Sequence, residues 1–351
     1  MAIACMGACF WQCSNESENG ASLKNALYTN TNRLNRALDK IQSSAGYQLL
    51  MAGSQETVKS ASVDELLYPD SIRLEDISGI YEYTRPDSIF YCDHGFYNLF
   101  EKTGESNNLI VKLPSERLYR PYKLMYPLDG DTAVRNNFII TATDYHFYFS
   151  HGYFYDYGLF AGFEQDNTPL GNLKIQSSRN EGFDSDFSSS FTFSEGHSIN
   201  VEQHTGDTST YSIALMDGAA TMFSEYLKIV RSDHHKPHVF EYALVIGNVM
   251  LMKSSDNDSL QIYLNGILQP DAKVEVIEYN DDVTDEKKHS VCHDRDIQIT
   301  FEDGTVTTIS ELLGPSKEVM AQLVDSIRAM YFSTKVIDYI AWNIYRTSKL
   351  E

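Results

Sequence analysis

The chain has 351 residues, 42 % of them hydrophobic, and a formal net charge of −21. This length can bury a core in one large or two ordinary domains, and this apolar content excludes a globally disordered chain. The 49 acidic side chains outnumber 28 basic ones, and no run of five basic residues occurs. Because phosphate binding needs clustered lysine and arginine, the composition argues against nucleic acid as a partner.

The N-terminal segment is apolar and rich in cysteine. Residues 1–12 carry no charge, Cys5, Cys9 and Cys13 lie close together, and residues 14–20 change abruptly to Ser, Asn, Glu and Gly. A membrane-spanning helix needs about 20 apolar residues, whereas the apolar region of a secretory signal takes about 7–15. The segment therefore has the length of a signal and not that of a membrane span.

This arrangement resembles the precursors of bacterial lipoproteins of the Bacteroidetes type, in which an apolar run ends at a diacylated cysteine and an acidic tether follows. The resemblance is confined to residues 1–20 and implies lipidation of Cys13, a tether from Ser14 to Gly20, and anchorage at the outer membrane or cell surface. Cys9, which follows Met6-Gly7-Ala8, fits the small-residue rule for cleavage better. The alternative is a buried N-terminus in a cytoplasmic protein.

Two further cysteines, Cys92 and Cys292, would remain beside the acylated one after cleavage at Cys13. In an oxidising compartment such a pair can form a disulfide bridge. Two unpaired buried thiols are the alternative.

Both ends of the chain show helical periodicity. Residues 22–42 predict a helix with Ser22 as its N-cap, since apolar side chains recur at threes and fours: Leu23, Leu27, Leu34, Leu38 and Ile41. Residues 319–331 and 336–344 carry similar apolar stripes and predict C-terminal helices.

From residue 137 the pattern changes to alternation with long aromatic runs, which is typical of strands. Asn265-Gly266 and Asp303-Gly304 are signals for tight hairpins. The predicted strands include Phe138–Thr143, Tyr145–Phe149, Tyr153–Phe163, Ser198–Gln203, Tyr211–Met216, Glu241–Lys253, Leu260–Leu264, Lys273–Tyr279 and Ile297–Phe301.

These elements predict an α+β fold with a predominantly antiparallel β-sheet core, an N-terminal helix and C-terminal helices. The chain divides into five predicted regions, namely a signal-like segment (1–13), a tether and N-terminal helix (14–60), a mixed strand and loop region (61–135), a β-rich domain (136–270), and strand hairpins followed by C-terminal helices (271–351).

The aromatic run from Tyr145 to Tyr157 is the strongest local feature. Side chains alternate between the faces of a strand, so Tyr145, Phe147 and Phe149 would face the core while His146 and Tyr148 could be exposed. Exposed tyrosines on a rigid sheet suit sugar or peptide binding, and cross-strand packing is the alternative. The predicted ligand-binding residues are His146, Tyr148, Tyr153, Tyr155 and Tyr157.

The densest histidine group is His234, His235 and His238, which could share a transition metal. The spacing matches no established zinc motif, and Pro237 indicates a turn, so a solvated loop is the alternative. No cofactor is predicted.

The chain contains no nucleophile elbow, P-loop, dinucleotide fingerprint or CxxC motif. Their absence favours a binding protein over an enzyme, and we expect a lipid-anchored cell-envelope protein that binds a glycan, a peptide or an envelope protein. The alternatives are a structural or assembly component of an envelope complex, and a glycan or peptide hydrolase. A glycosidase would need two carboxylates about 5–10 Å apart, for which the candidates are Asp144, Asp156 and Glu164.

Overall fold

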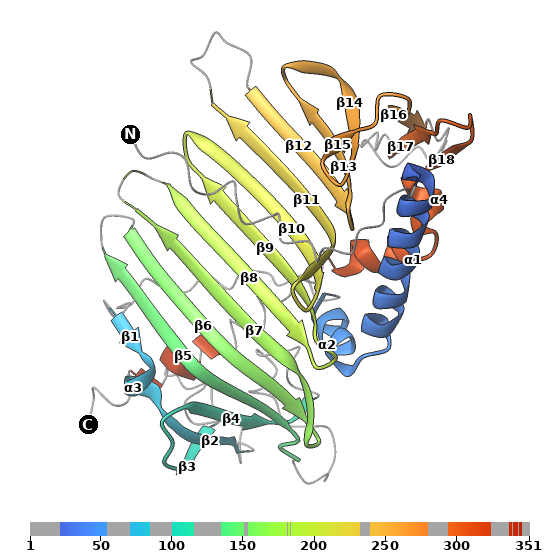
Figure 1. The fold of residues 1–351 in the computed structure, drawn as a ribbon. Helices are drawn as coiled ribbons and strands as arrows, with labels where there is room; N and C mark the ends of the chain where they lie inside the picture. Colours follow the sequence, from blue (N-terminus) through green and yellow to red (C-terminus); the bar gives the residue numbers. More distant parts are fainter. Residues whose placement is uncertain are drawn as a thin grey trace, which may run out of the picture.

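The computed structural model describes residues 22–54, 71–84, 100–115, 135–150, 154–180, 182, 184–231, 239–279, 294–323, 337–338, 340–342 and 344–345. Their dominant feature is one large twisted sheet with helices packed against it (Figure 1). The predicted α+β class with a mainly antiparallel core is confirmed.

The helices lie near the two ends of the chain. They are α1 (Leu23–Gln42), α2 (Ala45–Ser54), α3 (Leu74–Ile77) and α4 (Ile309–Leu313). Residues 316–323 and the described residues from 337 to 345 are also helical. Helix α1 confirms the predicted N-terminal helix. Ser22 is its N-cap, as predicted, because the Ser22 side chain accepts a hydrogen bond from the Asn25 amide.

The strands fill most of the chain between these helices. They are β1 (Ser71–Arg73), β2 (Gly79–Tyr83), β3 (Phe100–Gly104), β4 (Leu109–Leu113), β5 (Phe138–Ser150), β6 (Phe154–Gln165), β7 (Thr168–Arg179), β8 (Ser185–Phe193), β9 (His197–Thr205), β10 (Thr208–Asp217), β11 (Ala220–Val230), β12 (Val239–Ile246), β13 (Val249–Ser254), β14 (Asn257–Leu264), β15 (Ile267–Leu268), β16 (Lys273–Tyr279), β17 (Asp294–Thr300) and β18 (Val306–Thr308).

The main sheet has 15 strands in the order β15-β14-β13-β12-β11-β10-β9-β8-β7-β6-β5-β4-β2-β3, and β1 pairs with the second half of β5. From β5 to β15 each strand lies beside its neighbour in sequence, so this part is an antiparallel meander. Strands from the predicted regions 61–135 and 136–270 thus share one sheet. Strands β16, β17 and β18 form a separate small sheet.

Two-residue turns connect many of these strands. The predicted hairpin at Asn265-Gly266 is confirmed, with φ of 50° and 76° as a type I′ turn requires. The prediction of one strand over Glu241–Lys253 is wrong, because Gly247 adopts a φ of 61° and turns the chain between β12 and β13. A turn of only two residues inside an apolar run leaves no break in the hydrophobic pattern.

Helix α1 is fastened to this turn by Asn30. The Asn30 side-chain amide donates to the Ile246 carbonyl at 3.0 Å and to the Asn248 side-chain oxygen at 2.7 Å. The amide lies where a Cβ atom on Gly247 would be. Both the positive φ and this close approach therefore require glycine at position 247.

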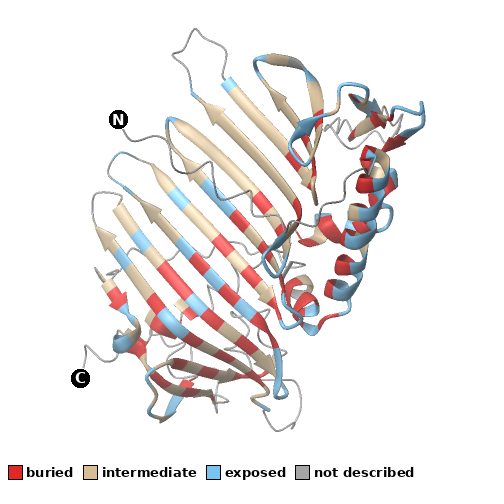
Figure 2. Cartoon of the chain, viewed as in Figure 1, coloured by how far each residue is buried: buried red, intermediate tan, exposed pale blue. Residues whose placement is uncertain are grey.

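The core lies between the helices and one face of the sheet, which we call the inner face. Apolar side chains of α1, such as Leu27 and Leu38, are completely buried there in one core with sheet residues such as Leu173 and Phe191. Each such side chain contributes about 1.5–3 kcal/mol by leaving water. Figure 2 shows that buried positions concentrate at the strand ends next to α1 and α2.

The other ends of the strands extend beyond α1 and α2 (Figure 1). We call this part the free half of the sheet, and none of its residues is buried: 146–150, 154–157, 176–179, 185–188, 202–205, 208–212, 226–230 and 239–243. In β5, for example, Phe138, Ile140 and Ala142 are buried, whereas His146 to Ser150 are half-buried or exposed. The side chains of the free half are therefore less buried than those of the strand ends next to α1 and α2.

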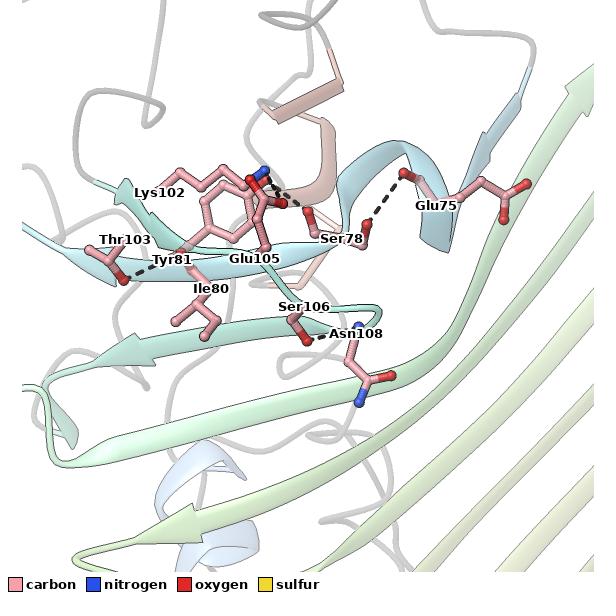
Figure 3. Close-up of polar contacts among 9 residues, drawn as sticks. All are labelled: Glu75, Ser78, Ile80, Tyr81, Lys102, Thr103, Glu105, Ser106 and Asn108. Atoms are coloured by element: carbon pink, nitrogen blue, oxygen red, sulfur yellow. Dashed lines mark hydrogen bonds and ion pairs between the residues drawn. The ribbon is translucent and has the colours of Figure 1, made fainter.

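The far edge of the sheet is a short strand with charged side chains, β3 (Figure 3). Lys102 forms an ion pair with Glu105 at 2.8 Å, and the Tyr81 hydroxyl of the neighbouring strand donates to the Ser78 carbonyl at 3.4 Å. Short length and charge discourage pairing of an edge with other chains. The length and charge of β3 thus protect this edge from such pairing.

Candidate functional site

The pairing of β5 with β6 decides where the predicted aromatic residues point. His146 lies opposite Gly158 and Tyr148 opposite Asp156, whereas Tyr155 and Tyr157 lie opposite Phe149 and Phe147. His146 and Tyr148 therefore share the outer face, while Tyr155 and Tyr157 lie on the inner face. The structure does not bring the predicted set together, and Tyr153 lies outside the described residues.

The predicted alternation along β5 is confirmed. The Tyr145 side chain is 1 % exposed and Phe147 packs against the core, while Tyr148 on the opposite face is 42 % exposed. The outer face of this strand is consequently the one that can meet a ligand in solution.

Four side chains form a compact group on that face, which we call the exposed patch: His146, Tyr148, Phe154 and Asp156. The rings of Tyr148 and Phe154 lie 5.8 Å apart at 74°, an edge-to-face contact. The His146 Nε2 atom lies 3.6 Å from an Asp156 carboxylate oxygen, and the two side chains are 39 % and 54 % exposed. Apolar ring surface and polar groups are thus presented side by side.

Gly158 leaves the space in which the His146 imidazole packs. A Cβ atom at this position would collide with the His146 ring, so the ring lies directly over the glycine backbone. Gln176 and Ser178 of β7 lie beside Gly158 and Asp156 in the register, and Arg73 of β1 lies beside His146. Hydrogen-bonding side chains therefore surround the two rings on a hydrogen-bonded sheet.

Such a surface suits a ligand with both apolar and hydroxyl-bearing faces. Aromatic rings offer contact area at low conformational-entropy cost, while carboxylate, imidazole, amide and hydroxyl groups fix orientation. The exposed patch has both kinds of group, and binding is the chemistry that it supports best.

The inner face of the same strands holds a different cluster. Asp338, from the C-terminal helical segment, accepts hydrogen bonds from the hydroxyls of Tyr145 at 3.2 Å and Tyr157 at 3.0 Å. Burial raises the pKa of the Asp338 carboxyl to about 7, although the two hydroxyls act in the opposite direction. Trp342 of the same segment packs on Phe147 with ring centroids 5.3 Å apart.

This cluster fastens the C-terminal segment to β5 and β6, which is a structural role. Asp338 could not be predicted as part of a cluster, because a single acidic residue within an apolar helical stripe matches no motif. Burial likewise raises the pKa of the Tyr145 hydroxyl well above its usual value, so this hydroxyl stays a donor at neutral pH.

Several predicted site residues lie outside the described residues, namely Cys13, Cys92, Cys292, His234, His235 and His238. Within the part of the chain that the structure describes, no group of three or more His, Cys, Asp or Glu side chains is placed to hold a metal ion. The metal and disulfide predictions therefore remain predictions.

The candidate glycosidase carboxylates are separated along the strands. Asp144 lies opposite Phe160, Asp156 opposite Tyr148, and Glu164 opposite Ile139. Asp144 is offset from Asp156 and from Glu164 by four positions each along β6 (160 to 156 and 160 to 164), or about 13 Å. This exceeds the spacing of a glycosidase pair, so these three residues do not form one.

None of the helices among the described residues is both long and apolar enough to cross a membrane. A comparison with models of known protein families finds no match, and searches of curated proteins and of solved structures find none either. The geometry of the chain itself therefore carries the functional conclusion.

Proposed function

We propose that the protein is a lipid-anchored cell-envelope binding protein whose exposed patch binds a glycan. The observation that supports this most is the open pair of aromatic rings, Tyr148 and Phe154, beside the His146–Asp156 pair. A sugar ring can stack its C–H face on an aromatic ring while its hydroxyls bond to neighbouring polar groups. A peptide is the alternative ligand for the same surface.

The position of the patch in the sheet favours binding without rearrangement. Strand β5 is hydrogen-bonded to β1 on one side and to β6 on the other at Tyr148, and β6 is in turn bonded to β7. A ligand would therefore meet a rigid surface, and little binding energy would be lost in ordering the site.

The lipid anchor is proposed from the N-terminal sequence, where Cys13 and the acidic tether precede Ser22. The start of α1 lies beside the small sheet, since Lys24 pairs with Asp303 at 2.8 Å. Figure 1 shows α1 at the side of the main sheet opposite to β5 and β6. The described chain thus begins, at Ser22, on the side of the main sheet away from the exposed patch.

Binding can be tested with panels of immobilised oligosaccharides and peptides probed with the soluble protein. We expect retention on a subset of glycans and a loss of about tenfold or more in affinity for Tyr148→Ala, since truncation of a central aromatic contact costs at least about 1.4 kcal/mol. Phe160→Ala is the matched control, because Phe160 is 40 % exposed on the outer face of β6 but lies outside the patch.

Three outcomes contradict the proposal. Absence of retention on every glycan and peptide would reject a binding role of this kind. Equal retention of wild type and Tyr148→Ala would reject the exposed patch as the site. Retention on peptides alone would reject the glycan as the ligand class.

A further inference from the structure

The histidine–aspartate pair of the exposed patch has a counterpart further across the same face of the sheet. His204 of β9 lies opposite Asp186 of β8, and its Nδ1 atom is 2.7 Å from an Asp186 carboxylate oxygen. The two side chains are 39 % and 69 % exposed, and those of His146 and Asp156 are 39 % and 54 % exposed. Each pair therefore presents an imidazole and a carboxylate side by side to solvent.

The strand register places the two pairs in one row. Asp156 lies opposite Ser178 of β7, and Ser178 lies opposite Asp186. Directly opposed residues point to the same face, which is the outer face for all three. Because neighbouring strands lie about 4.8 Å apart, Asp156 and Asp186 are separated by about 10 Å, with Ser178 between them.

A further carboxylate, that of Asp184, lies beside the second pair over Gly206. A Cβ atom on Gly206 would be 2.7 Å from an Asp184 carboxylate oxygen and 3.1 Å from the His204 Nε2 atom. Asn180 helps to position Asp184, because its side-chain oxygen accepts a hydrogen bond from the Asp184 amide at 3.1 Å. We call this group the second patch: Asp184, Asp186, His204 and Gly206.

The second patch offers the polar groups to which sugar hydroxyls bond. An ionised carboxylate accepts hydrogen bonds at two oxygens, and a neutral imidazole whose Nδ1 donates to Asp186 has an acceptor at Nε2. Between the two patches the outer face of β7 and β8 carries amide and hydroxyl side chains: Gln176, Ser178 and Ser188. A polar outer face is usual for an antiparallel sheet. The recurrence of the same pair in the same row is the feature that points to a repeating ligand.

We propose that the second patch is a further sugar subsite, and that the ligand is a neutral, linear glycan whose chain runs across the strands from β5 to β9. The inference rests on the proposed function of the exposed patch. A linear glycan repeats its hydroxyls at regular intervals, and a separation of about 10 Å is longer than one sugar ring, so a single sugar cannot occupy both patches. The carboxylates of Asp156, Asp184 and Asp186 would repel a uronic-acid or sulfated chain.

Two subsites on one rigid sheet make affinity depend on chain length. Strands β7 and β8 are hydrogen-bonded to a neighbour on each side, so the second patch needs little ordering when a ligand arrives. Once a chain is held at the exposed patch, contact with the second patch is intramolecular. Affinity should therefore rise with chain length until both patches are filled, and then level off.

The test is titration calorimetry of the full chain with malto-, cello-, manno- and xylo-oligosaccharides of one to eight units, beside an oligogalacturonate series. We expect at least one neutral series to bind, with an affinity about tenfold or more higher for long chains than for the shortest that bind. Asp186→Ala should lose most of this gain and keep the affinity for the shortest chains, whereas Tyr148→Ala should weaken binding at every length.

Glu195→Ala is the matched control, because it removes one exposed carboxylate from the turn at the other end of β8. It should bind like wild type at every length, and a thermal melt that matches wild type verifies that each variant is folded. Equal affinity for short and long chains would overturn this inference and leave the proposed function intact. An undiminished gain in Asp186→Ala, or tighter binding of the galacturonates, would also overturn it. Absence of binding by every series would overturn the proposed glycan ligand as well.

Discussion

Asp338 links the stability of the protein to pH through one carboxyl group. Its pKa is about 7 in the folded chain against 3.8 for an ordinary aspartate, so the folded state holds the proton more tightly than the unfolded state. Stability must then fall as pH rises from about 4 to about 7 and level off above that range. At about 1.4 kcal/mol per pKa unit, the loss amounts to at most about 4 kcal/mol. The substitution Asp338→Asn removes the titrating group and keeps an oxygen that accepts from Tyr145 and Tyr157. We expect the variant to be more stable than wild type at pH 8 and to lack this pH dependence, as measured by urea unfolding at pH 5 and pH 8. Asp156→Asn is the control, because Asp156 is exposed and should leave the pH dependence unchanged. Wild-type stability that stays constant over this range would contradict the raised pKa of Asp338.

The sequence alone predicted which side chains of β5 face the core and which face solvent, because alternation with period 2 is a local property. It could not predict that Tyr155 and Tyr157 lie on the opposite face from Tyr148, since this depends on the connection between the two strands.

The two-residue turns offer a matched comparison at the scale of the element. Gly247 and Gly218 have φ of 61° and 58° and each sits in a tight hairpin, but only Gly247 has a neighbour, Asn30, where its Cβ would be. Alanine at either site should cost about 1–2 kcal/mol for the left-handed backbone. Gly247→Ala should cost at least about 1 kcal/mol more, because it also displaces the Asn30 amide that ties α1 to the sheet. Urea unfolding of both variants measures the difference, and equal losses of stability would show that Asn30 does not stabilise the turn.

The helix α1 itself was predictable because its apolar stripe repeats over the full length of the element. The split of the apolar run into β12 and β13 could not be predicted, since Gly247 and Asn248 are too short an interruption of the hydrophobic pattern and of the strand propensity.

At the scale of the whole molecule, the sequence indicated an antiparallel sheet with helices at both ends of the chain, but not that α1 and α2 cover only one end of the strands. Phe187, Tyr211 and Tyr242 alternate like core residues, and the structure leaves them half-buried in the free half. How much of a strand the helices cover depends on long-range packing, and the alternation of apolar and polar residues holds no information about it.

The proposed anchor is tested at this scale too. Expression of the chain in a bacterial host with lipoprotein processing should yield a mature N-terminus with a diacylglyceryl group on Cys13 or Cys9, as determined by mass spectrometry. An unprocessed, unacylated Met1 would contradict the anchor and reopen a cytoplasmic location.

The proposed function requires that the outer face of β5 and β6 is open to ligands in the intact protein. Hydroxyl-radical footprinting of the purified full chain, read residue by residue by mass spectrometry, tests it directly. We expect fast labelling of Tyr148 and Phe160, which are 42 % and 40 % exposed, and protection of Tyr145 and Phe191, which are each 1 % exposed. Protection of Tyr148 equal to that of Phe191 would show that the exposed patch is covered, and would contradict its role as a binding surface.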